Sequence, residues 1–95
     1  MRCYLVCYDI RNPRRLRRVH QVMKGYGEPW QYSVFFCRLR DIDRVRLQTD
    51  LRKEMNLRQD QTIILDLGAD DRKAREAACV IGLPFPKPDS SIVVV

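Results

Sequence analysis

The order of apolar and amphipathic segments predicts an α+β domain, with two helices packed on one sheet. Residues 3–8 are continuously apolar, and a stripe with three- and four-residue steps follows from Leu16 to Tyr26. Extended patterns return at residues 28–39 and 61–67, and a second helical segment lies between them at about 41–56. A chain of 95 residues has room for one such domain. A ferredoxin-like βαββαβ sandwich is the most economical arrangement, because it keeps the first strand central.

The first strand and the first helix carry clear local signals. Residues 3–8 (CYLVCY) lack polar alternation, which is typical of a central strand buried on both faces. Asn12 and Pro13 predict a helix start, with Asn12 as the N-cap and Pro13 in the first helical position. The apolar stripe of that helix consists of Leu16, Val19, Met23 and Tyr26. Gly25 and Gly27 predict its end.

Residues 28–39 (EPWQYSVFFCRL) alternate as extended chain does, in either one bent strand or two short ones. One face would carry Trp30, Tyr32, Val34 and Phe36, and the other Ser33, Phe35 and Cys37.

The second helix, at about 41–56, would be capped by Asp41 or Asp43. We expect it to turn inward Ile42, Val45, Leu51 and Met55, and outward Arg44, Arg46, Arg52 and Lys53. Acidic residues alternate with the outward bases, which is typical of a solvated, paired surface, so this face is left out of the site.

The last third of the predicted domain is less regular. Residues 61–67 (QTIILDL) predict a strand closed by Gly68, and residues 69–77 predict a turn or a short helix. The short apolar run 78–81 is expected to be the last strand of the sheet. The predicted ferredoxin-like domain therefore covers residues 1–82.

The C-terminal tail suggests pairing between chains. Residues 83–89 hold three prolines and predict an irregular spacer. Residues 90–95 (SSIVVV) end in an apolar β-branched run that a monomer would leave exposed. An extra C-terminal strand, paired with the partner chain's sheet, would cover this run and give a two-fold homodimer. The alternative is that the tail folds back on its own sheet edge.

Charge and cysteine content indicate the class of partner and the compartment. The net charge of +6, supplied mostly by arginine, favours a polyanionic partner, since the guanidinium group matches phosphate geometry. A merely basic soluble surface is the alternative. The four cysteines lie in apolar stretches without a CxxC pair, which predicts buried free thiols in a reducing compartment. With one histidine, no signal peptide and no membrane span in the sequence, we expect a cytoplasmic protein without zinc or membrane association.

The candidate site lies where the first strand ends. Asp9 follows the apolar run, at a sheet edge where side chains are open to ligands. A structural loop carboxylate, bonded to backbone N–H groups or to an arginine, is the alternative. Four arginines occupy the first half of the following helix, where the helix dipole disfavours cations. They are Arg14, Arg15, Arg17 and Arg18. Their clustering predicts a bound anion, and the phosphates of a nucleic acid fit.

A second carboxylate would complete a metal site at Asp9. In a two-fold dimer with Asp9 near the axis, two Asp9 side chains would face each other and repel unless a cation neutralised them. Mg²⁺ is the expected cation because it prefers oxygen ligands. Together with the arginines it would supply the elements of phosphodiester hydrolysis, with Asp9 of both chains as the catalytic and metal-binding residue.

Three motifs stand in a specific order along the chain. Tyr8-Asp9-Ile10 follows the apolar strand, Gly25-Tyr26-Gly27 ends the arginine-rich helix, and Trp30-Gln31-Tyr32-Ser33-Val34-Phe35 comes next. In this order and spacing the sequence resembles the CRISPR-associated Cas-two (Cas2) family, whose signature includes Gln-x-Ser-Val-Phe. Length, strand order and the apolar tail also agree, so the resemblance covers nearly the whole chain.

The resemblance implies a ferredoxin-like homodimer and a metal-dependent endonuclease in which Asp9 of both chains holds Mg²⁺ at the interface. Family members variously cut single-stranded RNA or double-stranded DNA, and some show no relevant nuclease activity. In spacer acquisition they bridge dimers of the CRISPR integrase and hold the spacer DNA. We therefore expect either a magnesium-dependent endonuclease acting on RNA or DNA, or a non-catalytic dimeric DNA-binding scaffold that bridges the integrase.

Two departures from the family pattern remove carboxylates. Arg11-Asn12-Pro13 stands where the family often has further acidic residues, and Phe36 stands where it often has Glu. Both changes weaken catalysis more than phosphate binding. We expect Arg11 to join the four helix arginines in binding nucleic acid.

Other residues near Asp9 have open roles. Tyr8 and Ser33 would support the site, with packing as the alternative for each. A third hypothesis has Tyr32 and Phe36 stacking RNA bases on the sheet. The helices expected near that surface disfavour it, and such aromatic residues are more often core or dimer contacts.

Overall fold

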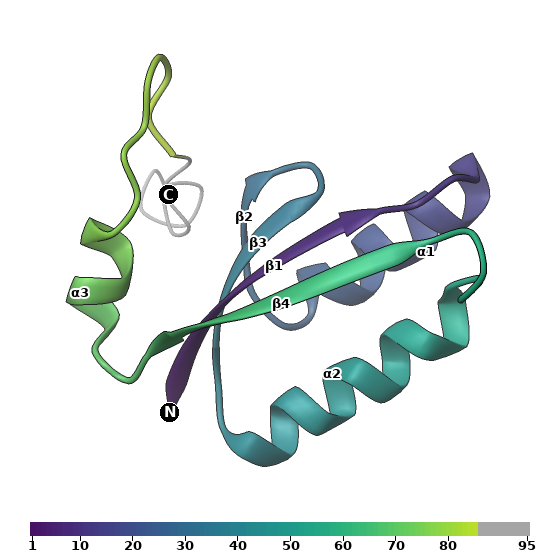
Figure 1. Ribbon diagram of the computed structural model, residues 1–95, viewed down its shortest axis with the longest axis horizontal. Helices are drawn as coiled ribbons and strands as arrows, with labels where there is room; N and C mark the ends of the chain where they lie inside the picture. Colours follow the sequence, from purple (N-terminus) through teal and green to yellow (C-terminus); the bar gives the residue numbers. More distant parts are fainter. Residues whose placement is uncertain (86–95) are drawn as a thin grey trace, which may run out of the picture.

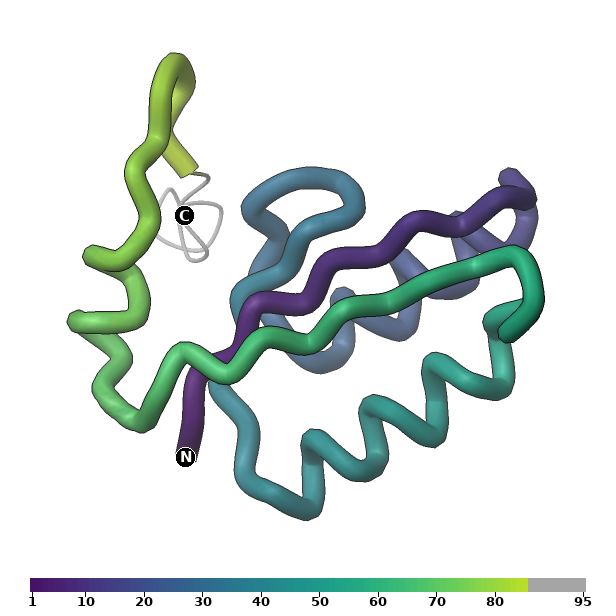
Figure 2. Tube along the Cα trace, in the orientation of Figure 1, coloured from purple at the N-terminus to yellow at the C-terminus, as the bar shows by residue number. Residues whose placement is uncertain are grey.

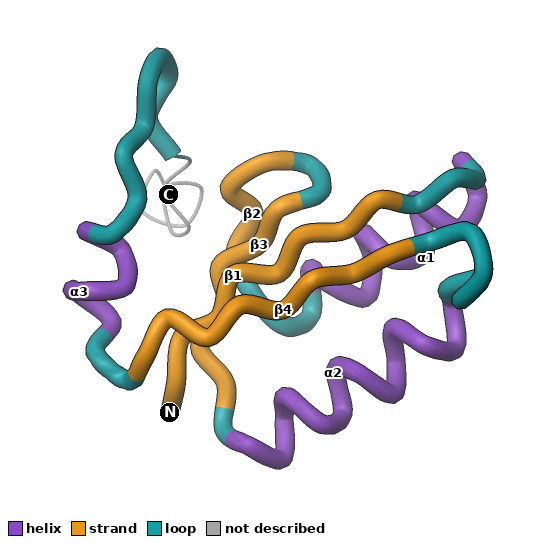
Figure 3. The backbone as a smooth tube through the Cα atoms, in the orientation of Figure 1, coloured by secondary structure: helices purple, strands orange, loops and turns teal. Residues whose placement is uncertain are grey.

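The computed structural model describes residues 1–85 (Figure 1). The elements are β1 (Arg2–Asp9), α1 (Pro13–Lys24), β2 (Glu28–Gln31), β3 (Val34–Leu39), α2 (Asp41–Glu54), β4 (Gln61–Gly68) and α3 (Asp71–Glu76). All strand pairs are antiparallel, in the order β2-β3-β1-β4, so the first strand is central. Figure 3 shows β1, α1, β2, β3, α2 and β4 in this order along the chain. The predicted α+β, ferredoxin-like arrangement is confirmed.

The main core lies between the sheet and the two long helices. From β1 it receives Tyr4, Val6 and Tyr8, which alternate along the strand and are at most 6% exposed. The helices contribute Val19, Met23, Leu47 and Leu51. On the opposite face, Leu5 and Cys7 are only half-buried. β1 is therefore central, but the prediction that both of its faces are buried is wrong for these two residues, because α1 and α2 both lie on the other face.

α1 begins at the predicted signals. The Asn12 side chain accepts hydrogen bonds from the backbone N–H groups of Arg14 and Arg15, at 2.9 and 3.1 Å, and Pro13 opens the helix. Gly25 ends the helix as its C-cap. These signals act within one turn, so they do not depend on the rest of the fold.

The segment 28–39 forms two strands joined by a turn at Tyr32 and Ser33. The turn changes the expected facing of the side chains. Trp30 and Phe36 pack on the face away from α1 and α2, whereas the Tyr32 ring stacks on His20 of α1. The prediction that Tyr32 shares a face with Trp30 and Phe36 is wrong, because simple alternation does not continue through a hairpin.

α2 differs from its predicted start. Arg40 is the N-cap residue and makes no side-chain capping bond. Asp41 and Asp43 lie in the first turn instead, where their charges favour the helix dipole, and Asp43 pairs with Arg40 at 2.8 Å. Neither aspartate is therefore the N-cap that the sequence predicts.

The inward face of α2 also differs from the prediction. Leu47 and Leu51, one turn apart, are its buried residues. Ile42 and Val45, predicted to point inward, are 50% and 48% exposed. The apolar residues of this helix do not share one stripe, so periodicity alone cannot choose the face that meets the core.

The last described segment is not a strand. α3 is the short helix that the sequence left open, and residues 78–81 follow it without strand structure. Figure 2 shows the chain leaving β4 and running along α3, apart from the two long helices. Residues 78–81 line a cavity over the open face of the sheet, shared with Leu5 and Cys7. Because they do not run along a sheet edge, they form no ladder, and the predicted strand at 78–81 is wrong.

Three further expectations concern the end of the chain. Cys79 is exposed, so the prediction that every thiol is buried is wrong for it. The predicted pairing strand 90–95, and residues 86–89 of the spacer, lie outside the described residues. No helix within residues 1–85 is both long enough and apolar enough to cross a membrane.

Candidate nucleic-acid site

Asp9 is the last residue of β1, opposite Gln61 of β4. Its side chain is 65% exposed and forms an ion pair with Arg11, with 3.4 Å between Oδ2 and Nη2. Within residues 1–85 it accepts no hydrogen bond from the backbone, so of the structural alternative only the pairing with an arginine is present, in the exposed Asp9–Arg11 ion pair. An exposed carboxylate of this kind is open to a ligand.

The exposed arginines of α1 stand in its first half, which follows Asp9 in the chain. Arg14, Arg17 and Arg18 are exposed, and the first turn of α1 has no acidic residue. Arg11 precedes the helix and has a side chain that is 67% exposed. Four of the five predicted arginines are therefore exposed, Arg11 within its ion pair with Asp9 and the other three on α1.

Arg15 is placed differently, because it pairs with the buried Asp60. Its Nε and Nη2 atoms donate to the two carboxylate oxygens at 2.8 and 3.1 Å, and Nη2 also donates to Gln59. The Arg15 side chain is 20% exposed and that of Asp60 is fully buried. Arg15 thus holds the fold together at this point.

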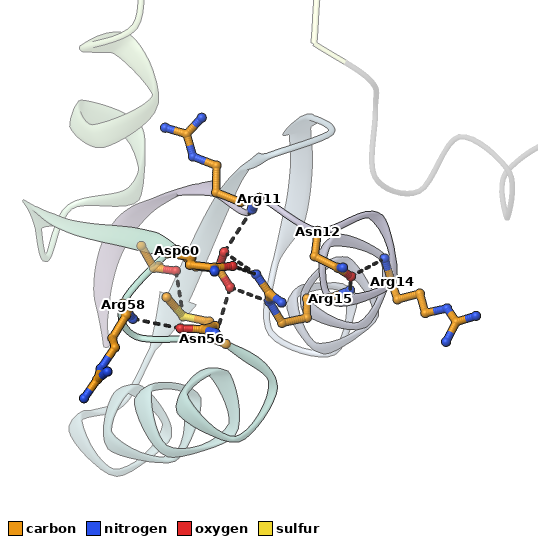
Figure 4. A network of polar contacts seen from close by, with 10 residues as sticks. Arg11, Asn12, Arg14, Arg15, Asn56, Arg58 and Asp60 are labelled. Carbon is orange, nitrogen blue, oxygen red and sulfur yellow. Dashed lines mark hydrogen bonds and ion pairs between the residues drawn. The ribbon is translucent and has the colours of Figure 1, made fainter.

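Asp60 ties two loops together at the Asp9 end of the sheet (Figure 4). Besides Arg15, it accepts hydrogen bonds from the backbone N–H groups of Arg11 and Asn56, each at 2.9 Å. The Arg15 side chain and these N–H groups hold the pKa of Asp60 well below its ordinary value. Figure 4 shows the guanidinium groups of Arg11 and Arg14 extending away from this network. Sequence analysis missed Asp60, which stands in a polar stretch with no distinguishing signal.

Tyr8 and Ser33 connect β1 to the β2–β3 hairpin. The buried Tyr8 hydroxyl donates to the Tyr32 carbonyl oxygen at 2.5 Å and lies 3.1 Å from His20 Nδ1. Burial raises the pKa of the Tyr8 hydroxyl. The Tyr8 N–H donates to the Ser33 carbonyl oxygen at 3.1 Å. Both residues position the hairpin beside Asp9, and the Tyr8 hydroxyl points into the protein.

The carboxylates of the described residues decide whether a metal ion fits at this end of the sheet. Among residues 1–85 there is no group of three or more His, Cys, Asp or Glu side chains that could hold a metal ion. Mg²⁺ keeps several waters and commonly binds through only one or two carboxylates. The exposed Asp9 carboxylate fits one of these positions, and a second Asp9 would fit the other.

Comparison with known proteins identifies the family. Residues 1–75 match the family model described as CRISPR associated protein Cas2. The CRISPR-associated endoribonuclease Cas2 of Geobacter sulfurreducens is 45% identical over 65 residues, 68% of this chain and 68% of that protein. The CRISPR-associated endoribonuclease Cas2 2 of Thermodesulfovibrio yellowstonii is 44% identical over 64 residues, 67% of this chain and 70% of that protein.

A solved structure agrees with these sequence matches. The crystal structure of Streptococcus pyogenes Cas2 at pH 6.5 has a TM-score of 0.75 and 26% sequence identity, covering 84% of this chain and 99% of that chain. The same β1 end, with Tyr8-Asp9-Ile10, falls inside the matched residues 1–75. The chain therefore belongs to the CRISPR associated protein Cas2 family.

Proposed function

We propose that this protein is a magnesium-dependent endoribonuclease of CRISPR defence that acts in the cytoplasm as a two-fold homodimer. The exposed Asp9 carboxylate, paired with Arg11 just before the arginine-rich first half of α1, carries the proposal. The relatives compared above are named endoribonucleases, which favours RNA as the substrate over duplex DNA.

The residues of the site have separate tasks in this proposal. Asp9 from each chain would hold Mg²⁺, which supplies Lewis acidity and charge neutralisation for phosphodiester hydrolysis when bound. Arg14, Arg17 and Arg18 would bind the phosphates on either side of the scissile bond. Arg11 would neutralise charge next to Asp9, and its ion pair with Asp9 would open as substrate arrives. Tyr8 and Ser33 would act by holding the hairpin in place.

The open face of the sheet supports the homodimer. Ile63 and Leu65 of β4 are each 51% exposed on the face that α1 and α2 leave open, next to the half-buried Leu5 and Cys7. A monomer rarely leaves a contiguous apolar sheet face in water, so a second copy is the occupant we propose. Pairing of the C-terminal strand 90–95 with the partner's sheet would extend the same interface.

Leu65→Arg should convert the dimer to a monomer and abolish RNA cleavage, because it places a charge at the centre of the proposed interface. Leu57→Arg is the matched control, since Leu57 is 66% exposed but lies in the loop between α2 and β4. Light scattering coupled to size exclusion measures the mass of both. A Leu65→Arg dimer as stable as the wild type would contradict the proposed interface.

The nuclease itself is tested with Asp9→Asn, which keeps the size of the side chain and removes its charge. Cleavage of single-stranded RNA in Mg²⁺ should fall at least roughly tenfold and should vanish for the wild type in EDTA. Asp66→Asn, at an exposed ion pair on β4, should cleave normally. Equal cleavage by Asp9→Asn and wild type would exclude Asp9 as the metal ligand.

A second candidate is a non-catalytic DNA scaffold that bridges the CRISPR integrase during spacer acquisition. The observation that favours it is the contrast between one exposed carboxylate and four exposed arginines at the site. Intact duplex binding by both wild type and Asp9→Asn, with no cleavage by either, would select the scaffold.

A further inference from the structure

We propose that Tyr32, supported by His20, is a stacking platform for an unpaired base of single-stranded RNA. The inference extends the proposed ribonuclease function by assigning a residue that selects single strands over duplexes. It starts from the observation that Tyr32 is the exposed end of a row of rings that begins in the core.

The Tyr32 ring is stacked on His20 and yet exposed to solvent. It lies parallel to the His20 ring, with 4.0 Å between centroids and 3° between planes. His20 in turn meets Phe35 edge-on at 5.4 Å, and Phe35 is fully buried. Tyr32 nevertheless remains 52% exposed. His20 covers one side of the ring, and the proposal places the base on the opposite side.

The platform is held in place before any ligand binds. The Tyr32 carbonyl oxygen accepts a hydrogen bond from the Tyr8 hydroxyl at 2.5 Å and lies 3.0 Å from His20 Nδ1. Both contacts fix the hairpin turn against β1 and α1. A ring that is already oriented loses little conformational entropy when a base stacks on it.

The surroundings of Tyr32 suit the backbone of a nucleic acid strand. Arg17 and Lys24 are exposed and stand three and four positions from His20, so they share its side of α1. Arg17 and Lys24 can contact phosphates while the base lies on Tyr32. Base–aromatic stacking next to a basic groove is the usual means of binding single strands.

The platform also lies close to the proposed catalytic residue. The β1–β3 ladder ends at Cys7 and Val34, so the hairpin tip with Tyr32 adjoins the end of β1 with Asp9. Alternation along β1 directs Tyr8 to the helix side and Asp9 away from it. An RNA whose base stacks on Tyr32 must therefore bend around the end of the sheet to reach Asp9. A flexible single strand can do so, whereas the bases of a duplex are stacked on one another and offer no free face.

A second row of stacked aromatic rings, around Trp30, does not provide a platform for a base. Trp30 stacks between Phe36 and Phe85, with centroid distances of 4.9 and 4.0 Å. Both faces of the Trp30 ring are covered, and Phe36 is 1% exposed. Among residues 1–85, Tyr32 is the exposed aromatic residue, and the other aromatic side chains are buried or half-buried.

The test measures binding in EDTA, so it does not depend on cleavage. The probes are a short unstructured RNA that carries one 2-aminopurine and the duplex of the same sequence. We expect Tyr32→Ala to bind the single strand about tenfold more weakly, within the range of one stacked base, and to lose the quenching of 2-aminopurine. Tyr32→Phe should behave as wild type, and duplex affinity should not change in either variant.

Control variants separate stacking from folding. Tyr32→Leu keeps apolar packing on His20 without a flat ring, so it should match Tyr32→Ala in binding and wild type in thermal unfolding. Leu57→Ala controls for loss of an exposed apolar side chain elsewhere. The proposal is overturned if the wild type does not bind the single strand, if Tyr32→Leu binds it normally, or if single-strand and duplex affinities fall together. Absence of cleavage in Mg²⁺ with Tyr32-dependent binding intact would reject only the nuclease.

Discussion

Asp60→Asn should lower the free energy of unfolding by about 3 kcal/mol, because it breaks a buried charge pair. The Asp60 carboxylate is fully buried and accepts four hydrogen bonds, two from Arg15 and one each from the backbone N–H groups of Arg11 and Asn56. An asparagine side chain has nearly the same shape as an aspartate, but its NH₂ group would face the N–H donors that now bind the carboxylate. In a domain of this size the midpoint of thermal unfolding should fall by roughly 10–20 °C.

The acid dependence of stability separates this effect from a general loss of packing. Because the folded pKa of Asp60 is depressed, its stabilisation is complete above the ordinary pKa of about 4 and is lost as the pH falls toward the folded pKa. Urea unfolding should therefore show a wild-type advantage over Asp60→Asn that shrinks from about pH 6 to about pH 2. Asp66→Asn, at an exposed pair, should change stability little. An advantage that is independent of pH would exclude the ion pair as its source.

Reversal of Arg14, Arg17 and Arg18 to Glu should abolish binding of duplex DNA and flatten its salt dependence. Each arginine that neutralises a phosphate releases counterions, which steepens the fall of affinity with salt by nearly one unit of slope. The three side chains are exposed on α1 and close to Asp9 in the sequence. Fluorescence anisotropy at several salt concentrations measures both the affinity and the slope.

A charge-matched control decides whether the loss of duplex binding comes from α1 or from the change in net charge. Reversal of Arg46, Arg52 and Lys53 to Glu changes the net charge of +6 by the same amount, from exposed positions on α2. We expect this control to weaken duplex binding only moderately and to retain most of the salt slope. Equal losses in the two triple variants would show that α1 is not the binding surface.

The parts of the fold that follow from local rules could be predicted from sequence. Asn12, Pro13 and Gly25 mark the ends of α1 because capping involves groups within one turn. The apolar run 3–8 likewise identifies the central strand, because its lack of polar alternation can be read from consecutive residues. The strand expected at 78–81 was wrong, since a short apolar run says nothing about whether a sheet edge is within reach.

The candidate site shows the same division between near and distant contacts. Asp9 and the exposed arginines stand together in the sequence, so their grouping could be predicted. The different position of Arg15 could not, because its partner Asp60 is 45 residues away in the chain. Tyr32 was assigned to the wrong face because its neighbour His20 lies on α1, across a turn that alternation does not reveal.

The central place of β1 in the sheet has a consequence for folding while the chain is being synthesised on the ribosome. β1 is made first, yet one of its two partners, β4, is made last among the four strands. A nascent chain that ends between Arg18 and Asp60 already carries Asp9 and every arginine of α1, but lacks the Asp60 carboxylate that binds Arg11 and Arg15. Pairing of β1 with β4, which are far apart in the chain, is slow compared with local helix formation. The end of the sheet that carries Asp9 is thus ordered late. A prematurely terminated chain would expose Arg11 and Arg15, without their contacts to Asp60, to cellular RNA.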